Sequence, residues 1–297
     1  MGLALIAGQG GVPPHLARVL LARGEVPVIC EVAQFPSQVA DDLPRLGFRL
    51  ESFGSLLDAL CARGVTRLCM AGAMRRTAVD PARIDAATAP LMPRLMAAMA
   101  QGDDGTLSEI VAIIEEAGIA VIGAAEIAPD LLPEAGVLAG VLPDMEAGIG
   151  AAEAALAEMG RADTGQAVVV RGGTVIARED ARGTDAMLDD LATGADWSLD
   201  PFDIADRALG SAADWLSGAD TQAQAPAFLY KAPKPGQEMR VDMPVIGPDT
   251  ALRAAQAGLA GIVIAAGGVM VIERAQVVEV LARAGMFLWV RAAGGQG

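Results

Sequence analysis

The chain has 297 residues, of which 53% are hydrophobic and 3% aromatic, and its net charge is −15. This length suits one or two domains with aliphatic cores. The negative charge excludes general nucleic-acid binding and broad electrostatic adhesion to anionic lipid, whereas a local apolar patch remains compatible with membrane contact.

No apolar run reaches the roughly 18 residues of a spanning helix. The N-terminus lacks the basic flank of a signal peptide, so we expect a cytoplasmic protein. The three cysteines, Cys30, Cys61 and Cys69, show no CxxC spacing. They are predicted to be buried free thiols, not disulfide or zinc ligands.

The first part of the chain alternates short apolar runs with stretches of helical periodicity. Strands are expected at 3–7, 26–31, 66–71 and 119–123, and helices at 14–23, 55–63 and 106–117. Such alternation predicts right-handed βαβ units and a mostly parallel sheet. We therefore predict an N-terminal Rossmann-like domain over residues 1–128.

Residues 129–145 contain proline and glycine without clear periodicity and are interpreted as a linker. A C-terminal catalytic α/β domain with a mixed sheet is predicted over 146–297. It is expected to open with an Ala-rich helix at 146–161, followed by a hairpin around the Gly-Gly pair at 172–173. Further strands are expected at 227–230, 261–265, 269–272 and 286–290, and helices at 185–191, 249–257 and 274–284. The acidic stretch 194–224 is interpreted as exposed and mobile.

A glycine-rich turn, Gly-Gln-Gly-Gly at 8–11, follows the first strand and precedes a helix. The backbone N–H groups of Gly10 and Gly11 could contact an anion at the helix N-terminus, although a plain tight turn is an equal alternative. The spacing is not GxGxxG, and only Glu31 stands near the position of a ribose-binding acid. A Rossmann-like oxidoreductase is therefore the weaker hypothesis. His15 is the only histidine and is predicted to be structural.

Both lysines of the chain, Lys231 and Lys234, lie in one strip that also holds Gln237, Asp242 and three prolines, whereas arginine occurs 20 times. An ammonium is a compact charge that suits phosphate, Gln237 is a neutral donor, and a carboxylate can bind magnesium. A solvated loop is the structural alternative. The combination favours magnesium-assisted hydrolysis of a phosphate ester or anhydride.

A second motif, Gly-Thr-Asp at 183–185, precedes a predicted helix, with Glu179 and Asp180 just upstream. Thr184 or Asp185 is a natural helix N-cap, which is the structural interpretation. The functional interpretation is that the helix N-terminus and its carboxylate bind a phosphate or a magnesium ion.

Together these motifs resemble a known family, the LpxI-type UDP-2,3-diacylglucosamine pyrophosphatases of lipid A biosynthesis. The resemblance spans essentially the whole chain in order and spacing. It is carried by residues 6–13, 102–104, 163–166, 183–188 and 231–247.

The resemblance implies magnesium-dependent hydrolysis of UDP-2,3-diacylglucosamine to UMP and 2,3-diacylglucosamine 1-phosphate (lipid X). It implies two α/β domains and a catalytic Asp242, which either binds Mg²⁺ or orients the attacking water. The implied substrate-binding residues are Gly10, Gly11, Gly72, Gln166, Thr184, Asp185, Lys231, Lys234 and Gln237. The expected partners are the acylated UDP-sugar and lipid X, with peripheral contact at the inner face of the inner membrane and a homodimer left open.

The chain departs from the family pattern at three places. Ala125 stands where a histidine is common, Arg182 where an acid precedes Gly-Thr-Asp, and residues 72–77 lack an asparagine and a proline. A catalytically weak or inactive homologue that binds lipid or nucleotide is therefore the alternative hypothesis.

Overall fold

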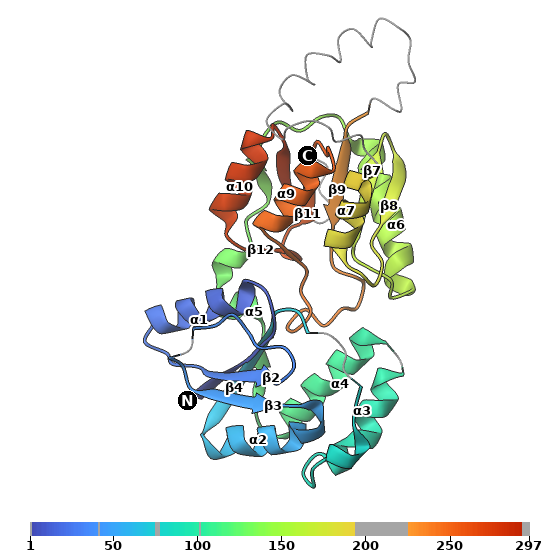
Figure 1. Cartoon of the computed structure of the whole chain (residues 1–297). Coiled ribbons are helices and arrows are strands. Elements are labelled where there is room, and N and C mark those ends of the chain that lie inside the picture. Colours follow the sequence, from blue (N-terminus) through green and yellow to red (C-terminus); the bar gives the residue numbers. More distant parts are fainter. Residues whose placement is uncertain (1, 41, 75–77, 101, 194–224, 293–297) are drawn as a thin grey trace, which may run out of the picture. The chain divides into compact units, whose positions relative to one another are not determined.

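The computed structural model describes residues 2–40, 42–74, 78–100, 102–193 and 225–292. The chain forms two compact units, each built on its own sheet (Figure 1). Unit 1 comprises Met1–Asp130 and Gln237–Met243, and unit 2 comprises Leu131–Gly236 and Pro244–Gly297. The chain therefore passes from one unit to the other three times. The stretch 194–224, interpreted above as mobile, lies outside the described residues.

Unit 1 contains a five-stranded parallel sheet in the order β3-β2-β1-β4-β5. Its strands are β1 (Gly2–Ala7), β2 (Val28–Val32), β3 (Arg45–Phe48), β4 (Val65–Ala71) and β5 (Ala120–Ile122). The predicted parallel sheet is confirmed, and only β3 was not anticipated. Strand order reverses between β1 and β4, and open α/β sheets bind ligands beyond the strand ends at such a point.

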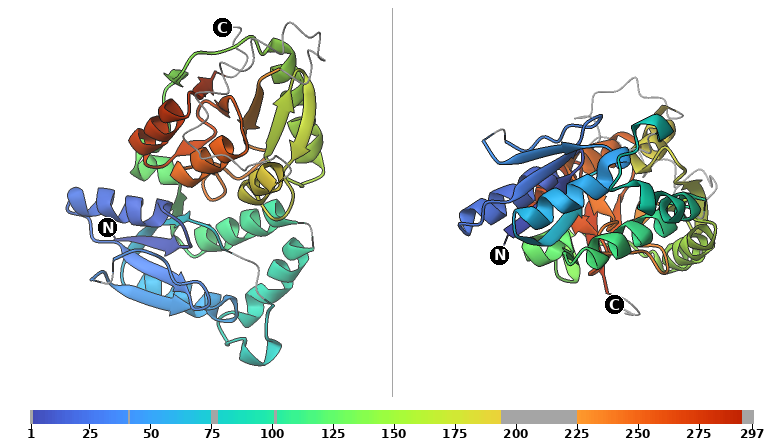
Figure 2. Two further views of the ribbon diagram at one scale, coloured as in Figure 1. Left: turned by 45° about the horizontal axis from the view of Figure 1, so that its top comes forward. Right: turned by 90° about the horizontal axis from the view of Figure 1, so that it is seen from below.

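Helices cover both faces of the unit 1 sheet, because alternate strand residues point to opposite faces. Ala4 and Ile6 of β1 pack with residues of α2, α3 and α4 in one core cluster. The other face carries α1 and α5, which contact each other (Figures 1 and 2). The helices are α1 (Val12–Ala22), α2 (Phe53–Ala62), α3 (Met92–Met99), α4 (Asp103–Glu116) and α5 (Ala124–Ile127), with 3-10 turns η1 (Leu50–Ser52), η2 (Pro81–Arg83), η3 (Ala89–Leu91) and η4 (Pro129–Leu131).

Unit 2 contains a six-stranded mixed sheet in the order β6-β13-β11-β9-β7-β8. The three central strands β13, β11 and β9 are parallel, whereas β6, β7 and β8 are each antiparallel to a neighbour. The strands are β6 (Gly136–Ala139), β7 (Ala167–Arg171), β8 (Thr174–Arg178), β9 (Ala227–Lys231), β11 (Gly261–Ala265) and β13 (Phe287–Arg291), with a separate parallel pair of β10 (Val245–Ile246) and β12 (Met270–Val271). The mixed sheet is confirmed, and the range predicted as a linker contributes β6 to it.

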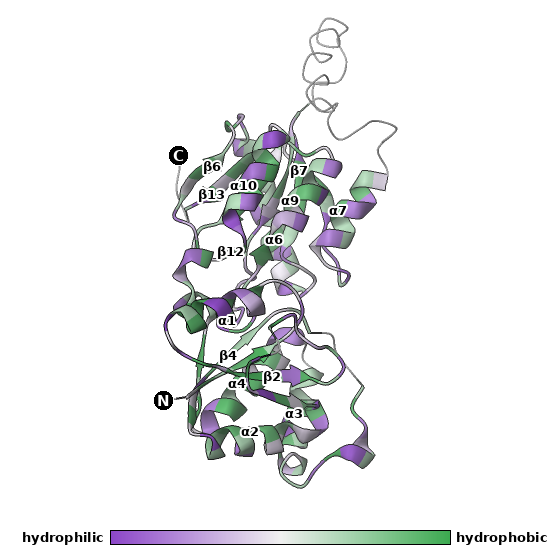
Figure 3. Cartoon of the chain, turned by 60° about the vertical axis from the view of Figure 1, so that its left-hand side comes forward, coloured by the Kyte–Doolittle hydropathy of each residue, from purple (hydrophilic) through white to green (hydrophobic). Residues whose placement is uncertain are grey.

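The unit 2 sheet also lies between helices. Val168 and Val170 of β7 pack with α6 (Glu146–Arg161). Ala167 and Val169 point the opposite way, into a cluster with α7 (Thr184–Thr193), α9 (Pro248–Gln256) and α10 (Arg274–Arg283). The helices show both hydrophobic and hydrophilic colours in Figure 3, as expected when one face of each is buried. Among the described residues, no helix has the length and apolarity required to cross a bilayer.

The three cysteines are free thiols, as predicted, but they differ in burial. Cys30 and Cys69 are buried, and burial raises the pKa of each thiol to about 12. The prediction of burial is wrong for Cys61, which is exposed near the end of α2. The helix places Cys61 on the outward side while its neighbour Leu60 enters the core.

Candidate active site

Several predicted site residues of unit 2 meet at one edge of its sheet. Because β7 is antiparallel to both β8 and β9, it begins where they end, and Ala167 pairs with Lys231. Gln166 directly precedes β7, and Glu179 directly follows β8. Thr184 is the first residue of α7. Strand pairing therefore brings together residues that lie far apart in the sequence.

A buried chain of hydrogen bonds connects these residues. The Lys231 ammonium donates to the Thr184 hydroxyl at 2.9 Å, and that hydroxyl donates to Oε1 of Glu179 at 2.7 Å. The backbone N–H of Gln166 donates to Oε2 of Glu179 at 2.8 Å. Lys231, Thr184 and Glu179 are 6%, 6% and 9% exposed. We call Lys231, Thr184, Glu179 and Gln166 the Lys231 network, in which a buried cation and a buried carboxylate are linked through one hydroxyl.

Lys234 is held by a different partner. Its Nζ lies 2.5 Å from Oδ1 of Asp163, and its side chain is only 10% exposed. Asp163 adopts a left-handed backbone conformation with φ 51°. The motif at 163–166 is therefore fixed at one end by Lys234 and at the other by the bond from Gln166 to Glu179. Thr184 thus accepts a hydrogen bond from Lys231, whereas Lys234 pairs with Asp163.

Two of the three prolines of the lysine strip pack directly against glycines of unit 2. A Cβ placed on Gly160 would lie 2.5 Å from Cδ of Pro235, and one on Gly268 would lie 2.8 Å from Cδ of Pro233. Real Cβ contacts are not this short, so both positions need glycine unless the strip moves. The strip is therefore held in place by packing as well as by its charges.

This packing predicts opposite effects of the same substitution at two places in α6. Gly150→Ala should stabilise the protein by about 0.5–1 kcal/mol, because alanine favours helix and its Cβ meets nothing within 4 Å. Gly160→Ala should destabilise it by about 1–3 kcal/mol, because the added methyl group displaces Pro235. Chemical unfolding of both variants tests this, and equal stabilisation by both would contradict the packing of the strip.

The structure does not bring Asp185 into the Lys231 network. Its side chain is half exposed, and Oδ2 lies 3.7 Å from Nε of Arg253. Arg182, which replaces the acid of the family pattern, is exposed and pairs with Asp180 at 2.9 Å and Asp190 at 2.7 Å. The hydrogen bonds from Arg182 lower the pKa of Asp180. Arg182 and Asp185 thus both form ion pairs at the protein surface, whereas Thr184 between them is buried.

In unit 1, the predicted glycines gather at the carboxyl ends of β1 and β4. A Cβ on Gly8 would lie 2.6 Å from the carbonyl oxygen of Ala73, and one on Gly72 would lie 2.7 Å from that of Gln9. These glycines are therefore required for the close approach of two loops. Gly10 differs, because it has φ 96° and open space around it.

Gly11 is the N-cap of α1, and the helix carries proline in its first turn. Proline has no N–H, so the backbone donors at this helix end are concentrated in the glycine turn before it. Gly10, Gly11 and Gly72 therefore come together at the strand-order reversal, where folds of this type bind ligands.

The segment with Asp242 belongs to unit 1, although the sequence placed it within the C-terminal domain. Val241 packs against the unit 1 core. A Cβ on Gly123, which follows β5, would lie 3.5 Å from Cα of Arg240. The segment Gln237–Met243 thus lies at the carboxyl edge of the unit 1 sheet.

Asp242 is fixed within this segment by Gln237, which is 7% exposed. The Gln237 amide donates to the Asp242 carbonyl at 2.5 Å and to Oδ2 at 2.7 Å. The Asp242 N–H donates to the carbonyl of Glu238 at 3.0 Å. Arg240 pairs with Glu238 and with Glu115, both at 2.7 Å, and its hydrogen bonds lower the pKa of Glu238. The structure therefore brings Gln237 and Asp242 together.

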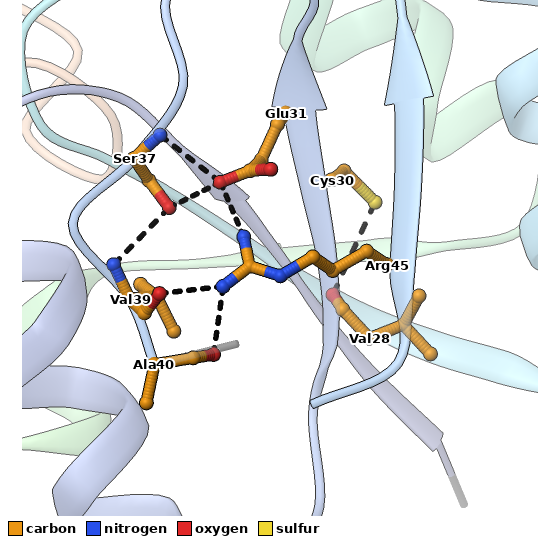
Figure 4. A network of polar contacts seen from close by, with 7 residues as sticks. All are labelled: Val28, Cys30, Glu31, Ser37, Val39, Ala40 and Arg45. Carbon is orange, nitrogen blue, oxygen red and sulfur yellow. Dashed lines mark hydrogen bonds and ion pairs between the residues drawn. The ribbon is translucent and has the colours of Figure 1, made fainter. Parts of the chain in front are cut away.

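Glu31, considered above as a ribose-binding acid, anchors a loop (Figure 4). Its Oε1 accepts from the Ser37 N–H at 3.0 Å, the Ser37 hydroxyl at 2.5 Å and Arg45 at 2.5 Å. Arg45 also donates to the carbonyls of Val39 and Ala40. Burial opposes ionisation of Glu31, but the bonds from Ser37 and Arg45 outweigh it and lower its pKa. These contacts give the Glu31 carboxylate a structural role that needs no bound nucleotide. The oxidoreductase hypothesis is weakened accordingly.

Two residues of the unit 2 site were not predicted. Glu179 is buried in the Lys231 network, and Asp163 is the partner of Lys234. The sequence offered a hint for each of them, because Glu179 directly follows a predicted hairpin and Asp163 is the first residue of the motif at 163–166. Their partners depend on strand pairing across the sheet, which composition does not reveal. His15 of unit 1 lies 3.3 Å from Asp130, consistent with a structural role.

Comparison with known proteins gives matches over both halves of the chain. The family model described as the LpxI N-terminal domain matches residues 2–131, and that described as the LpxI C-terminal domain matches residues 134–289. The UDP-2,3-diacylglucosamine pyrophosphatase LpxI of Caulobacter vibrioides is 35% identical over 288 residues, covering 96% of each chain. A UDP-glucose 4-epimerase complex with NAD from Thermus thermophilus has 16% identity and a TM-score of 0.32, over 99% of this chain and 86% of its own. The last likeness is too low to carry an argument.

Proposed function

The chain belongs to the LpxI family, and we propose that it hydrolyses the diphosphate of UDP-2,3-diacylglucosamine in lipid A biosynthesis. One water molecule would be consumed, and the products would be UMP and 2,3-diacylglucosamine 1-phosphate (lipid X). The observation that carries the proposal is the 35% identity to the pyrophosphatase of Caulobacter vibrioides over 96% of both chains. A hydrolase acting on a diphosphate needs fixed cations and a carboxylate, and the described residues include both.

We assign the phosphate-binding role in unit 2 to Lys231 and Lys234. Phosphoryl transfer depends mainly on positioning and charge neutralisation, and a buried ammonium is more effective than a solvated one. Lys231 is held by Thr184, and Lys234 by Asp163, so neither must be ordered when substrate arrives. Gln166 and Asp185 are assigned to further substrate contacts because they belong to the same motifs.

In unit 1, we assign substrate contacts to Gly10, Gly11 and Gly72, which lie at the ligand-binding edge of this fold type. Backbone N–H groups in a glycine turn before a helix suit a phosphate or another anion. Gln237 is assigned the task of orienting Asp242, to which it donates two hydrogen bonds.

Magnesium is part of the proposal, with Asp242 as its protein ligand. Mg²⁺ commonly binds one or two carboxylates and completes its shell with water and substrate phosphates. The donor chemistry fits this pattern, since Asp242 offers one carboxylate, whose Oδ2 is oriented by the Gln237 amide. When bound, Mg²⁺ would neutralise charge on the diphosphate.

Asp242 has a second candidate role, as the group that orients the attacking water and accepts its proton. The Asp242 backbone and carboxylate are fixed by Gln237 and Glu238, so its oxygen atoms have a defined direction. A carboxylate offers about four lone-pair positions, which lets it accept from Gln237 and still act on a ligand. Magnesium titration separates the two roles, as described in the Discussion.

We further propose that the enzyme works in the cytoplasm and contacts the inner face of the inner membrane peripherally. The proposed substrate carries two acyl chains, which favour contact with a membrane surface. Exposed apolar side chains, such as Val141 at 88% exposure, could contribute to such contact. A homodimer is compatible with this arrangement.

The proposal is tested by UMP release from UDP-2,3-diacylglucosamine by the purified chain. We expect release in the presence of Mg²⁺, loss of release in excess EDTA, and recovery when Mg²⁺ is restored. A chain that binds the lipid without releasing UMP under any of these conditions would instead be the inactive binding homologue. Release that is insensitive to EDTA would contradict the magnesium requirement alone.

A further inference from the structure

Glu179 accepts hydrogen bonds on both oxygens of its carboxylate. Oε1 accepts from the Thr184 hydroxyl at 2.7 Å, and Oε2 accepts from the backbone N–H of Gln166 at 2.8 Å. The residue is 9% exposed, and Thr184 is buried as well. One acid therefore touches both Thr184, which holds Lys231, and Gln166, to which a substrate contact was assigned above.

The two accepted bonds require a carboxylate at this position. An amide has one acceptor oxygen and one donor nitrogen, so glutamine would lose one of the two bonds in either orientation of its side chain. Leaving a buried donor without its acceptor is unfavourable. The contacts of Glu179 thus explain why an acid stands directly after β8.

Glu179 also determines the direction of the Thr184 hydroxyl. A hydroxyl has one donor hydrogen and two acceptor lone pairs. Because the hydrogen points to Glu179, the lone pairs are available to the Lys231 ammonium, which donates to the same oxygen at 2.9 Å. The position of the Lys231 charge is therefore coupled to Glu179 through a single oxygen atom.

We propose that Glu179 is a positioning residue that fixes the Lys231 ammonium through Thr184 and the start of β7 through the Gln166 backbone. Its consequence for catalysis rests on the proposed diphosphate hydrolysis, whereas the fixing of Lys231 does not. A buried carboxylate in a sugar-nucleotide site would otherwise repel the diphosphate. Here its charge is balanced by the lysine that it orients.

The catalytic consequence is tested with four variants and one control. Glu179→Gln and Thr184→Val should each lower kcat/KM for UMP release by about 10–10²-fold, because small displacements of a positioned group have effects of this size. Thr184→Ser, which keeps the hydroxyl, should retain most activity. The double variant Glu179→Gln/Thr184→Val should be no worse than the less active single variant, since both changes remove the same link. The control Glu158→Gln changes an exposed acid paired with Arg178 and should behave as wild type.

A second readout does not depend on activity. Lys231 and Lys234 are the only lysines in the chain, so brief acetylation with acetic anhydride followed by peptide mass spectrometry reports on each. The ratio of Lys231 to Lys234 acetylation should rise several-fold in Glu179→Gln and Thr184→Val. It should stay at the wild-type value in Thr184→Ser and Glu158→Gln. Thermal unfolding of every variant verifies that the folded protein is being labelled.

The outcomes separate this inference from the proposed function. An unchanged acetylation ratio in folded Glu179→Gln would overturn the positioning role, as would additive losses in the double variant. If the wild type releases no UMP while the variants show the predicted acetylation ratios, the proposed function is overturned and the positioning of Lys231 is supported.

Discussion

Asp242→Asn is expected to reduce kcat for UMP release by about 10²–10⁴-fold, the range found when a positioned acid–base group is removed. The asparagine can still accept the bond that the Gln237 amide makes to Oδ2, at 2.7 Å in the native protein. The substitution therefore removes the charge while keeping the local shape. Folding should be preserved, so the loss reports on chemistry.

Glu238→Gln is the matched control for this variant. It makes the same acid-to-amide change in the same segment, but the Glu238 side chain pairs with Arg240 at 2.7 Å, and the backbone carbonyl that accepts from Asp242 is left in place. We expect turnover close to that of the wild type. Equal turnover of wild type and Asp242→Asn would contradict the catalytic role, and a loss in Glu238→Gln as large as in Asp242→Asn would show that the segment acts only through its fold.

Magnesium titration of Asp242→Asn distinguishes the two candidate roles of the residue. If the carboxylate is a metal ligand, the variant needs more Mg²⁺ for half-maximal activity, and excess Mg²⁺ restores part of the rate. If the carboxylate orients water and accepts its proton, the loss is the same at every Mg²⁺ concentration. The conservative Asp242→Glu variant should recover neither role fully, since the longer side chain moves the oxygens.

Lys231→Arg is expected to have the second largest effect, a loss of about 10²-fold in kcat/KM. Lys231 is 6% exposed, and its ammonium donates to the buried Thr184 hydroxyl. A guanidinium is larger, planar and donates in a fixed fork, so it cannot replace the ammonium without displacing Thr184. Overpacking of this kind should also destabilise the protein by about 1–3 kcal/mol.

Lys234→Arg is the matched comparison, because it makes the same change three residues later. Lys234 forms an ion pair with Asp163, whose side chain is 33% exposed. A guanidinium can keep this pair with a partly exposed carboxylate. We therefore expect a smaller loss than for Lys231→Arg, although the sequence alone gives the two lysines the same role. Measurement of kcat/KM and thermal unfolding for both variants tests this, and equal losses would contradict the difference in their surroundings.

Much of the fold follows from local sequence patterns. The helix at 146–161 is found as predicted, and the Gly-Gly turn of the hairpin adopts the expected positive φ at Gly172 and Gly173. Strand β3 was missed because Arg45–Phe48 is short, contains a glycine and shows no apolar run. Its position is fixed by pairing with β2, and such pairing depends on tertiary contacts that local patterns do not encode.

The candidate site was predicted only in part, for the same reason. Lys231 and Lys234 were predicted as site residues because both lysines lie in one strip. Gln166, Thr184 and Asp242 were predicted from the motifs that contain them. The membership of Gln237–Met243 in unit 1 depends on the packing of Val241 against the unit 1 core, which no local pattern reveals. Glu179 was missed because the β7–β8 pairing, and not its sequence neighbours, carries it to Gln166.

The identity of the reaction products decides whether this chain splits the diphosphate of an acylated UDP-sugar. UDP-2,3-diacylglucosamine is incubated with purified wild-type protein and Mg²⁺, and every phosphate-containing product is identified by mass spectrometry. We predict UMP and 2,3-diacylglucosamine 1-phosphate in equal amounts, with no free UDP. Release of UDP with the unphosphorylated sugar would mean that the glycosidic bond is cleaved instead. Either that result or an unchanged substrate would rule out diphosphate hydrolysis by this chain.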